Sequence, residues 1–269
     1  MHCIVFPRFF QKLSVPQLAS ELSRLGFDGV DVMARDGYWT TPSNLPRTLS
    51  HFVRTMYDFG LSAENATTEY LDPNKPGAEA GVAALAENGI RQFRLKHIAY
   101  RGPKTYRSDL DRAKHYFDGW ERIGEKHGIR AFLQTHGGSI HPSASASIRL
   151  VEGLNPAYIG VHHDPGNMIC QEGYENWEIG FDILGEYLCM LGVKNAAFFQ
   201  TADGKWKRRW TPLAEGAVDY RQVLKAAQKT SFNGPLCMHN FYKRGLEHLK
   251  RQTRADLEHL RALIKEVEA

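Results

Sequence analysis

Five side chains suited to chemistry come at or just after the ends of short apolar segments in this 269-residue chain. They are Gln134 and His136 after one segment, Asp164 and Asn167 after a second, and His239 at the end of a third. Imidazole and carboxylate groups bind divalent metals and transfer protons near neutral pH, whereas an amide offers a neutral oxygen or hydrogen bonds. The pattern therefore predicts a polar site for a metal ion, a proton transfer or both.

The segments that must position these groups alternate in type along the whole chain. Eight short apolar segments predict strands at 3–6, 26–33, 61–65, 92–97, 131–135, 158–162, 192–199 and 235–239. Segments of helical period separate them, at 15–25, 45–59, 78–87, 108–127, 144–153, 176–190, 220–229 and 246–268. We interpret residues 1–269 as one α/β domain, a (β/α)8 TIM barrel. In such a barrel the residues that follow the strands share the catalytic face.

Two long connections follow predicted strands and should lie on that face. They cover residues 34–44 and 201–217, and the second is rich in aromatic and basic residues, Trp206 among them. We expect this connection to form a lid over a polar ligand, with Trp206 contacting the substrate. A crowded surface loop or a contact between copies of the chain explains the same composition equally well.

Four motifs resemble those of one enzyme family. They are Leu-Gly-Phe-Asp-Gly-Val-Asp-Val at 25–32, His-Gly-Gly at 136–138, Asp-Pro-Gly-Asn at 164–167 and Leu-Ala-Glu-Gly-Ala-Val-Asp at 213–219. Together, and in this order, they look like the sugar phosphate isomerase/epimerase family, whose barrels are similar to xylose isomerase and endonuclease IV. The resemblance spans nearly the whole chain and implies a xylose isomerase-like barrel.

The resemblance also implies a metal site, from which this chain departs. The family holds one divalent metal with a glutamate on strand five, an aspartate on strand six, a histidine on strand seven and a glutamate on strand eight. The matching positions here are Gln134, Asp164, Gly192 and His239. Gln134, Asp164 and His239 could still bind Mn, Zn or Mg. The alternative is that Asp164 and His136 form hydrogen bonds with loop backbone or substrate hydroxyls and that His239 is a satisfied barrel histidine.

The same departures alter the expected proton chemistry. The family's two glutamates act as acid and base, but a glutamine cannot accept and return a proton at neutral pH. His239 is then the preferred catalytic group, because an imidazole can act as acid, base or ligand. Lys194 is a second candidate, as a base or to polarise a carbonyl, although a structural ion pair is the interpretation that its residue type favours. His136, Asn167 and Lys96 are expected to contact the substrate.

We therefore expect an isomerase- or epimerase-like enzyme that acts on a sugar or sugar phosphate by proton transfer next to a carbonyl. Two alternatives remain: a catalytically altered barrel that binds a sugar-like ligand or partner without isomerase activity, and a carbohydrate lyase or dehydratase. A repair endonuclease is disfavoured, because such enzymes use a carboxylate-rich metal cluster and the net charge of +4 is modest.

Location and partners follow from composition. The four cysteines show no paired spacing, which favours reduced thiols in the cytoplasm. The amino terminus does not resemble a signal peptide, and no apolar run approaches the length of a membrane span. The expected partner is a small carbohydrate, with no nucleic acid and no membrane. Assembly into a homo-oligomer is left open.

Overall fold

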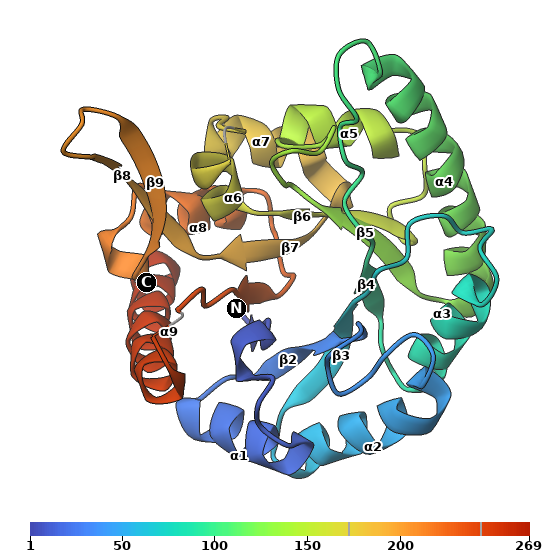
Figure 1. The fold of residues 1–269 in the computed structure, drawn as a ribbon, viewed down its shortest axis with the longest axis horizontal. Coiled ribbons are helices and arrows are strands. Elements are labelled where there is room, and N and C mark those ends of the chain that lie inside the picture. Colours follow the sequence, from blue (N-terminus) through green and yellow to red (C-terminus); the bar gives the residue numbers. More distant parts are fainter. Residues whose placement is uncertain (172, 243) are drawn as a thin grey trace.

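The computed structural model describes residues 1–171, 173–242 and 244–269. Eight parallel strands close into a barrel in the order β1-β10-β7-β6-β5-β4-β3-β2 (Figure 1). Their bounds are β1 Cys3–Val5, β2 Gly29–Met33, β3 Ser62–Thr67, β4 Gln92–Arg94, β5 Arg130–Gln134, β6 Ile159–His163, β7 Leu188–Val193 and β10 Leu236–Met238. The predicted eight-stranded barrel is confirmed.

Helices surround the barrel and cover its outer face (Figure 1). They are α1 Val15–Leu25, α2 Leu45–Asp58, α3 Ala78–Glu87, α4 Tyr106–His127, α5 Ala144–Val151, α6 Pro165–Cys170, α7 Trp177–Leu184, α8 Tyr220–Lys229 and α9 Leu246–Glu268, with 3-10 turns η1 Arg8–Phe10, η2 Gly185–Tyr187 and η3 Leu213–Glu215. Local sequence sets their ends. Ser14 and Gln17 form a reciprocal capping box at the start of α1, and Gly26 ends that helix in the left-handed conformation.

Buried apolar side chains form two separate clusters. The larger lies between the strands and the surrounding helices. The smaller comprises Ile4, Phe6, Met33, Phe132, Cys189, Met190 and Cys237. Because the helices cover the outside of the sheet, we assign this second cluster to the inside of the barrel. It forms an apolar support below the polar residues at the strand ends.

The seventh strand differs from the prediction. We expected a strand over 192–199, but β7 ends at Val193, and β8 (Asn195–Gln200) leaves the barrel to pair antiparallel with β9 (Trp206–Thr211). Thus the expected long loop over 201–217 contains a strand. The preceding helix ends at Leu184, earlier than predicted. One apolar run spans β7 and most of β8, so composition alone did not show where the barrel strand stops.

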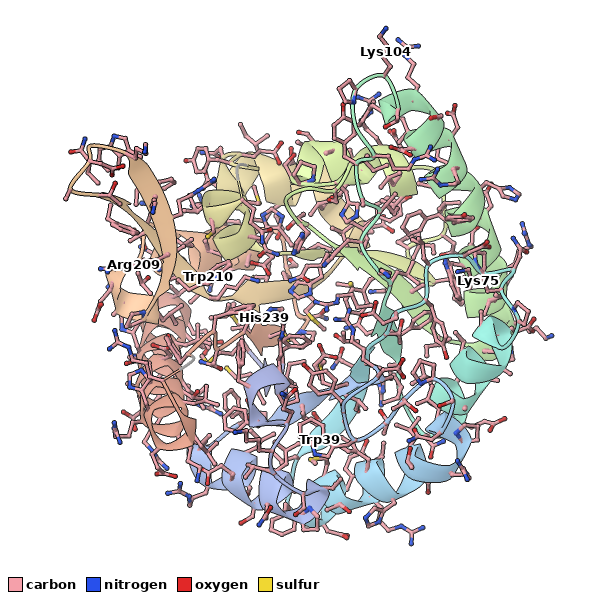
Figure 2. All side chains as sticks on the ribbon, viewed as in Figure 1. Trp39, Lys75, Lys104, Arg209, Trp210 and His239 are labelled. Atoms are coloured by element: carbon pink, nitrogen blue, oxygen red, sulfur yellow. The ribbon has the colours of Figure 1, made fainter. Side chains whose placement is uncertain are left out.

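The hairpin of β8 and β9 projects from the barrel beside α6, as the orange segment at the left of Figure 1 shows. Figure 2 shows Trp210, near the base of the hairpin, on the side that faces His239 and the barrel interior, whereas Lys75 and Lys104 lie at the periphery. Within the described ranges, no helix is both long and apolar enough to cross a membrane. The four cysteines are free thiols.

Candidate active site

Asp164 is fixed at the junction of β6 and α6. Its carboxylate accepts a hydrogen bond from the backbone N–H of Asn167, at 2.9 Å from Oδ1, and so caps α6. Its own backbone N–H donates to the hydroxyl of Thr135 at 2.8 Å. The Asn167 side chain donates to the carbonyl of Thr135 at 2.9 Å. These contacts hold the carboxylate of Asp164 toward the barrel interior in one orientation.

Lys194 follows β7 and places its ammonium group against this carboxylate. Its Nζ lies 2.8 Å from Oδ2 of Asp164 and 3.4 Å from Nδ1 of His239, and all three side chains are buried. Gly192 makes room for the pair, because a Cβ at this position would lie 2.5 Å from Cγ of Asp164. Burial would raise the pKa of Asp164, but the Lys194 ammonium, His162 and the backbone N–H of Asn167 together outweigh burial and hold that pKa below its usual value.

Gln134 lies beside the same carboxylate but presents its nitrogen. Its Nε2 donates to Oδ2 of Asp164 at 2.5 Å, while its Oε1 accepts from the guanidinium of Arg94. The network fixes this amide orientation, since the reverse would place oxygen against carboxylate and nitrogen against guanidinium. The oxygen that we expected to bind a metal is therefore engaged by Arg94.

Two buried charges, Asp31 and Arg94, were missed from the sequence. Arg94 lies 5.1 Å from the ring centre of Phe6. Oδ2 of Asp31 accepts a hydrogen bond from Thr67 at 2.7 Å, and its Oδ1 has no partner among the described residues. Burial raises the pKa of Asp31 to about 6, with Arg94 opposing the rise. The available signal was a charged residue inside each of two apolar strands, Val-Asp-Val and Phe-Arg-Leu.

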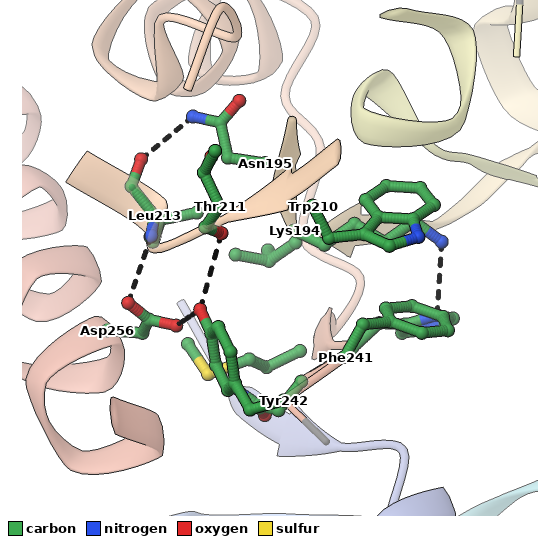
Figure 3. A pocket seen from close by; sticks show the side chains of 12 residues that line it. Lys194, Asn195, Trp210, Thr211, Leu213, Phe241, Tyr242 and Asp256 are labelled. Carbon is green, nitrogen blue, oxygen red and sulfur yellow. Dashed lines mark hydrogen bonds between the residues drawn. The ribbon is translucent and has the colours of Figure 1, made fainter. Parts of the chain in front are cut away.

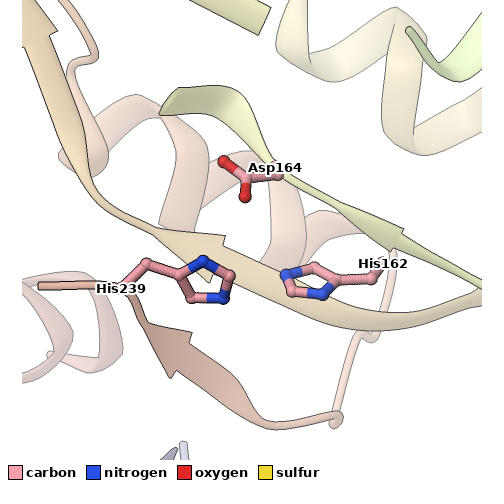
Figure 4. Close-up of side chains that lie close together, drawn as sticks. All are labelled: His162, Asp164 and His239. Carbon is pink, nitrogen blue, oxygen red and sulfur yellow. The ribbon is translucent and has the colours of Figure 1, made fainter. Parts of the chain in front are cut away.

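His162, Asp164 and His239 face one another at the centre of the site (Figure 4). Their ligand atoms lie within 4.8 Å of one another. Burial lowers the pKa of His162 to about 3 and that of His239 well below its usual value, so both are neutral at pH 7. In the part of the chain that the structure describes, both ring nitrogens of His162 and Nε2 of His239 have no hydrogen-bond partner. His162, which completes this group, was not selected from the sequence, while Gln134 lies beside the group as a hydrogen-bond donor to Asp164.

The three groups could hold a metal ion, because two neutral imidazoles and a carboxylate suit a divalent cation. The position of Lys194 conflicts with this. A divalent ion held by this group would lie about 2.0–2.2 Å from an oxygen of Asp164. The ammonium already lies 2.8 Å from Oδ2 of that carboxylate and 3.4 Å from Nδ1 of His239, so ion and ammonium would be close neighbours of like charge. As arranged here, the site does not fit a divalent ion unless Lys194 moves away.

The other predicted substrate contacts lie in different places. His136 is at the rim, where it stacks on His97 with ring centres 3.8 Å apart and donates from Nδ1 to the carbonyl of Gly137. Lys96 is largely exposed, 3.6 Å from Glu69. Trp206 is 69% exposed on the hairpin and lines a surface groove rather than the cavity beside Lys194.

The centre is closed by aromatic side chains. Figure 3 shows Trp210 and Phe241 beside the end of the Lys194 side chain. The two rings stack 4.9 Å apart, and Nζ of Lys194 lies 5.1 Å and 5.0 Å from their centres. The cavity here is about 10 Å³, enough for one water molecule. A sugar could reach Lys194 only after Trp210 and Phe241 move.

This combination of barrel and strand-end site agrees with the comparison to known families. The family described as xylose isomerase-like TIM barrel matches residues 19–263. The chain belongs to this family. A search of curated proteins found no match.

Solved structures show the same fold at low sequence identity. A xylose isomerase-like TIM barrel protein from Mycobacterium smegmatis, in complex with magnesium, is 15% identical with a TM-score of 0.68, covering 98% of this chain and 97% of that one. D-psicose 3-epimerase from Clostridium cellulolyticum H10 is 14% identical with a TM-score of 0.73, covering 98% and 99%. A probable 3-DHS dehydratase from Bacillus anthracis is 15% identical with a TM-score of 0.73, covering 97% and 99%. At these identities the likeness establishes the fold.

Proposed function

We propose that this chain is an isomerase- or epimerase-like enzyme that moves a proton next to the carbonyl of a sugar or sugar phosphate. The observation that carries the proposal is the buried centre in which the Lys194 ammonium lies between Asp164 and His239, with neutral His162 alongside. Proton removal beside a carbonyl needs a cation or hydrogen-bond donor at the oxygen and a base at the carbon. Both kinds of group are present here.

The proposed roles follow from the contacts. Lys194 polarises the carbonyl oxygen and stabilises the negative charge that develops on it. Because the ammonium faces Nδ1 of His239, that nitrogen accepts and the ring proton lies on Nε2, from where it can form a hydrogen bond to the same oxygen while staying on the ring. His162 has both ring nitrogens unpartnered among the described residues and is the base that receives the proton from carbon. Burial lowers its pKa to about 3, so this role requires the bound substrate to raise that pKa toward neutrality.

Substrate contacts are proposed for the rim. His136 and Lys96 lie at strand ends with exposed or half-buried side chains, where they could bind hydroxyl or phosphate groups. Asn167 can contribute only through groups not already engaged with Thr135. Trp206 could contact the substrate only if the hairpin moved toward the barrel, since the Trp206 side chain is exposed on the outside.

A bound Mn, Zn or Mg ion is the other source of positive charge. His162, Asp164 and His239 would hold it, and it would act as a Lewis acid on the carbonyl. The magnesium complex of the Mycobacterium smegmatis protein is in line with such an ion. This alternative requires Lys194 to leave Asp164.

Exchange of solvent deuterium into the substrate tests the proposed function. Purified protein should incorporate deuterium at the carbon beside the carbonyl of at least one ketose or keto acid in a broad panel. His162→Ala should lower the rate at least about 100-fold, the usual contribution of a general base. The exposed Lys205→Ala serves as the matched control and should leave the rate unchanged. No exchange across the panel, with and without added metal, would overturn the proposal.

A barrel that binds a sugar-like ligand without turnover is the second candidate. It is favoured by the closed cavity beside Lys194 and by the ion pair that already occupies Asp164. Calorimetric binding of a sugar without deuterium exchange would support this candidate. Exchange accompanied by loss of water from the substrate would instead indicate a lyase or dehydratase.

Location and assembly are proposed on separate grounds. Four free cysteines support a reducing, cytoplasmic location. A groove of about 520 Å³ beside the hairpin, lined by the exposed Tyr174, Phe198 and Trp206, supports contact with a second copy of the chain. Light scattering after size-exclusion chromatography measures the assembly state directly, and a strictly monomeric mass would contradict the contact.

A further inference from the structure

We propose that the ammonium group of Lys194 is the resident cation of this site, and that it occupies the place a divalent metal would need between Asp164 and His239. The wild-type chain then binds no divalent ion there, and removal of the ammonium creates a metal site. This inference does not rest on the proposed function, because it concerns which cation the site holds rather than which reaction it performs.

The Lys194 ammonium lies where a metal ion would be bound. Nζ of Lys194 contacts Oδ2 of Asp164 at 2.8 Å and Nδ1 of His239 at 3.4 Å. These two side chains, with His162, are the residues whose ligand atoms lie within 4.8 Å of one another. The ammonium and a metal ion would therefore compete for two of the three residues, Asp164 and His239.

Neighbouring residues also accommodate the ammonium. Gly192 has no Cβ, and a Cβ there would lie 2.5 Å from Cγ and 2.6 Å from Oδ2 of Asp164. Gln134 donates to Oδ2 of Asp164 from its amide nitrogen, so it supplies a proton donor where a metal would require a lone pair. With the backbone N–H of Asn167, the Asp164 carboxylate already accepts three donors.

The buried charges of this region already balance without a metal ion. Asp31 and Asp164 are the buried carboxylates of this region, and Arg94 and Lys194 are its buried cations. The flanking pair of Arg35 and Glu69 is also neutral overall. Adding a divalent ion would leave two uncompensated positive charges in a closed interior, which carries a large desolvation and repulsion cost.

The aromatic rings that cover Lys194 suit an ammonium better than a metal ion. The rings of Trp210 and Phe241 lie about 5 Å from Nζ. Aromatic faces attract an ammonium through their negative quadrupole. They have no lone pairs to bind a metal and leave space for about one water, so they cannot complete the hydrated coordination shell of a divalent ion.

Metal binding to a charge-removed variant tests the inference without any substrate. Lys194→Met keeps an unbranched side chain that is one atom shorter and removes the charged nitrogen. We expect it to bind one Zn²⁺ or Mn²⁺ per chain by titration calorimetry, at least about 100-fold tighter than wild type, because a full positive charge beside the ion has gone. Wild-type protein should show no stoichiometric metal by elemental analysis and no saturable binding.

Three controls locate the effect. Lys205→Met changes an exposed lysine that pairs with Asp203 and should bind no metal. Lys194→Arg keeps the charge and should also bind none. Adding His162→Ala to Lys194→Met should lower the gained affinity at least about 10-fold, as expected for loss of one ligand.

The inference is overturned if wild type binds one divalent ion as tightly as Lys194→Met, or if a folded Lys194→Met gains no affinity. Circular dichroism establishes folding of each variant. Should Lys194→Met not fold, the wild-type titration and the Lys194→Arg titration still decide the matter, since saturable binding by either contradicts an ammonium that occupies the site. Failure of the deuterium-exchange assay would leave all these outcomes unaffected.

Discussion

The barrel interior holds two carboxylates in opposite situations. Asp164, on the β6 side, accepts hydrogen bonds from Gln134, Asn167 and Lys194, and the Lys194 ammonium holds its pKa below the usual value against the effect of burial. Asp31, on the β2 side, has one hydrogen-bond partner, Thr67, and burial raises its pKa to about 6. Since both are fully buried, the difference arises from the number and charge of their partners.

Arg94 and Gln134 connect the two sides. Arg94 interacts electrostatically with both carboxylates, and its guanidinium donates to Gln134, which in turn donates to Asp164. Each buried carboxylate therefore has a buried cation near it, Arg94 near Asp31 and Lys194 near Asp164. We infer that the Asp164 side is a fixed ion pair, whereas the Asp31 side can gain or lose a proton near neutral pH.

The largest expected effect comes from breaking the ion pair. Asp164→Asn keeps the shape of the side chain but leaves the Lys194 ammonium buried without a counter-charge. Removing one partner of a buried ion pair typically lowers the free energy of unfolding by about 3–5 kcal/mol. Urea unfolding followed by circular dichroism measures the loss.

The matched control is an exposed aspartate paired with a lysine. Asp203 is 56% exposed and pairs with Lys205 at 2.8 Å. Asp203→Asn should change the free energy of unfolding by less than about 1 kcal/mol, because water screens the pair. Equal losses for Asp164→Asn and Asp203→Asn would show that burial does not distinguish the two pairs, and the contrast between the two sides of the barrel would fail.

The next largest expected effect is the pH dependence of the free energy of unfolding that Asp31 causes. Folding raises the Asp31 pKa from 3.8 to about 6, so between these values the folded chain holds more protons than the unfolded chain. Stability from this residue therefore falls as pH rises through that window, by about 3 kcal/mol in total. Asp31→Asn removes this dependence.

Buried neutral histidines act in the opposite direction over an overlapping range. Burial lowers the pKa of His162 to about 3 and that of His141 to about 3, so their contribution to stability grows as pH rises from about 3 to above 6. The diagnostic quantity is thus the difference in unfolding free energy between Asp31→Asn and wild type. This difference should shift in favour of the variant by about 2 kcal/mol from pH 4 to pH 7. A pH-independent difference would mean that Asp31 is not perturbed.

The sequence predicted the barrel and the position of Asp164 because both depend on local patterns, the alternation of apolar segments and a polar residue at a strand end. It could not predict that Asp164 and Lys194 pair, since that contact depends on the shear between β6 and β7 and on the room left by Gly192. Lys194 was open to two interpretations for this reason.

Asp31 and Arg94 were missed for a different reason. They lie within strands whose other residues are apolar, and β4 has only three residues, too few to show which side faces the interior. The end of β7 was misplaced because the apolar run continues into the hairpin, where partial exposure of β8 replaces burial. For Asp31 and Arg94 the decisive fact is a contact with a strand distant in sequence, and for β7 it is the pairing of β8 with the adjacent β9.

The smallest expected effects compare two tryptophans on the hairpin. Trp210 stacks on Phe241 and covers the Lys194 ammonium, so Trp210→Ala should lower the free energy of unfolding by about 2 kcal/mol. Trp206 is 69% exposed, and Trp206→Ala should change it by less than about 0.5 kcal/mol. Urea unfolding of both variants provides the measurement.

Trp210→Ala also separates the two sides of the barrel. It admits water to the Lys194 and Asp164 pair without touching Asp31, so the pH-dependent difference caused by Asp31→Asn should persist unchanged in the Trp210→Ala background. Independent sites give additive free energies, whereas sites that share a network do not. Loss of the Asp31 pH dependence in the Trp210→Ala background would mean that Arg94 and Gln134 couple the two carboxylates strongly enough for them to titrate as one unit. The division between a fixed Asp164 side and a titratable Asp31 side would then be wrong.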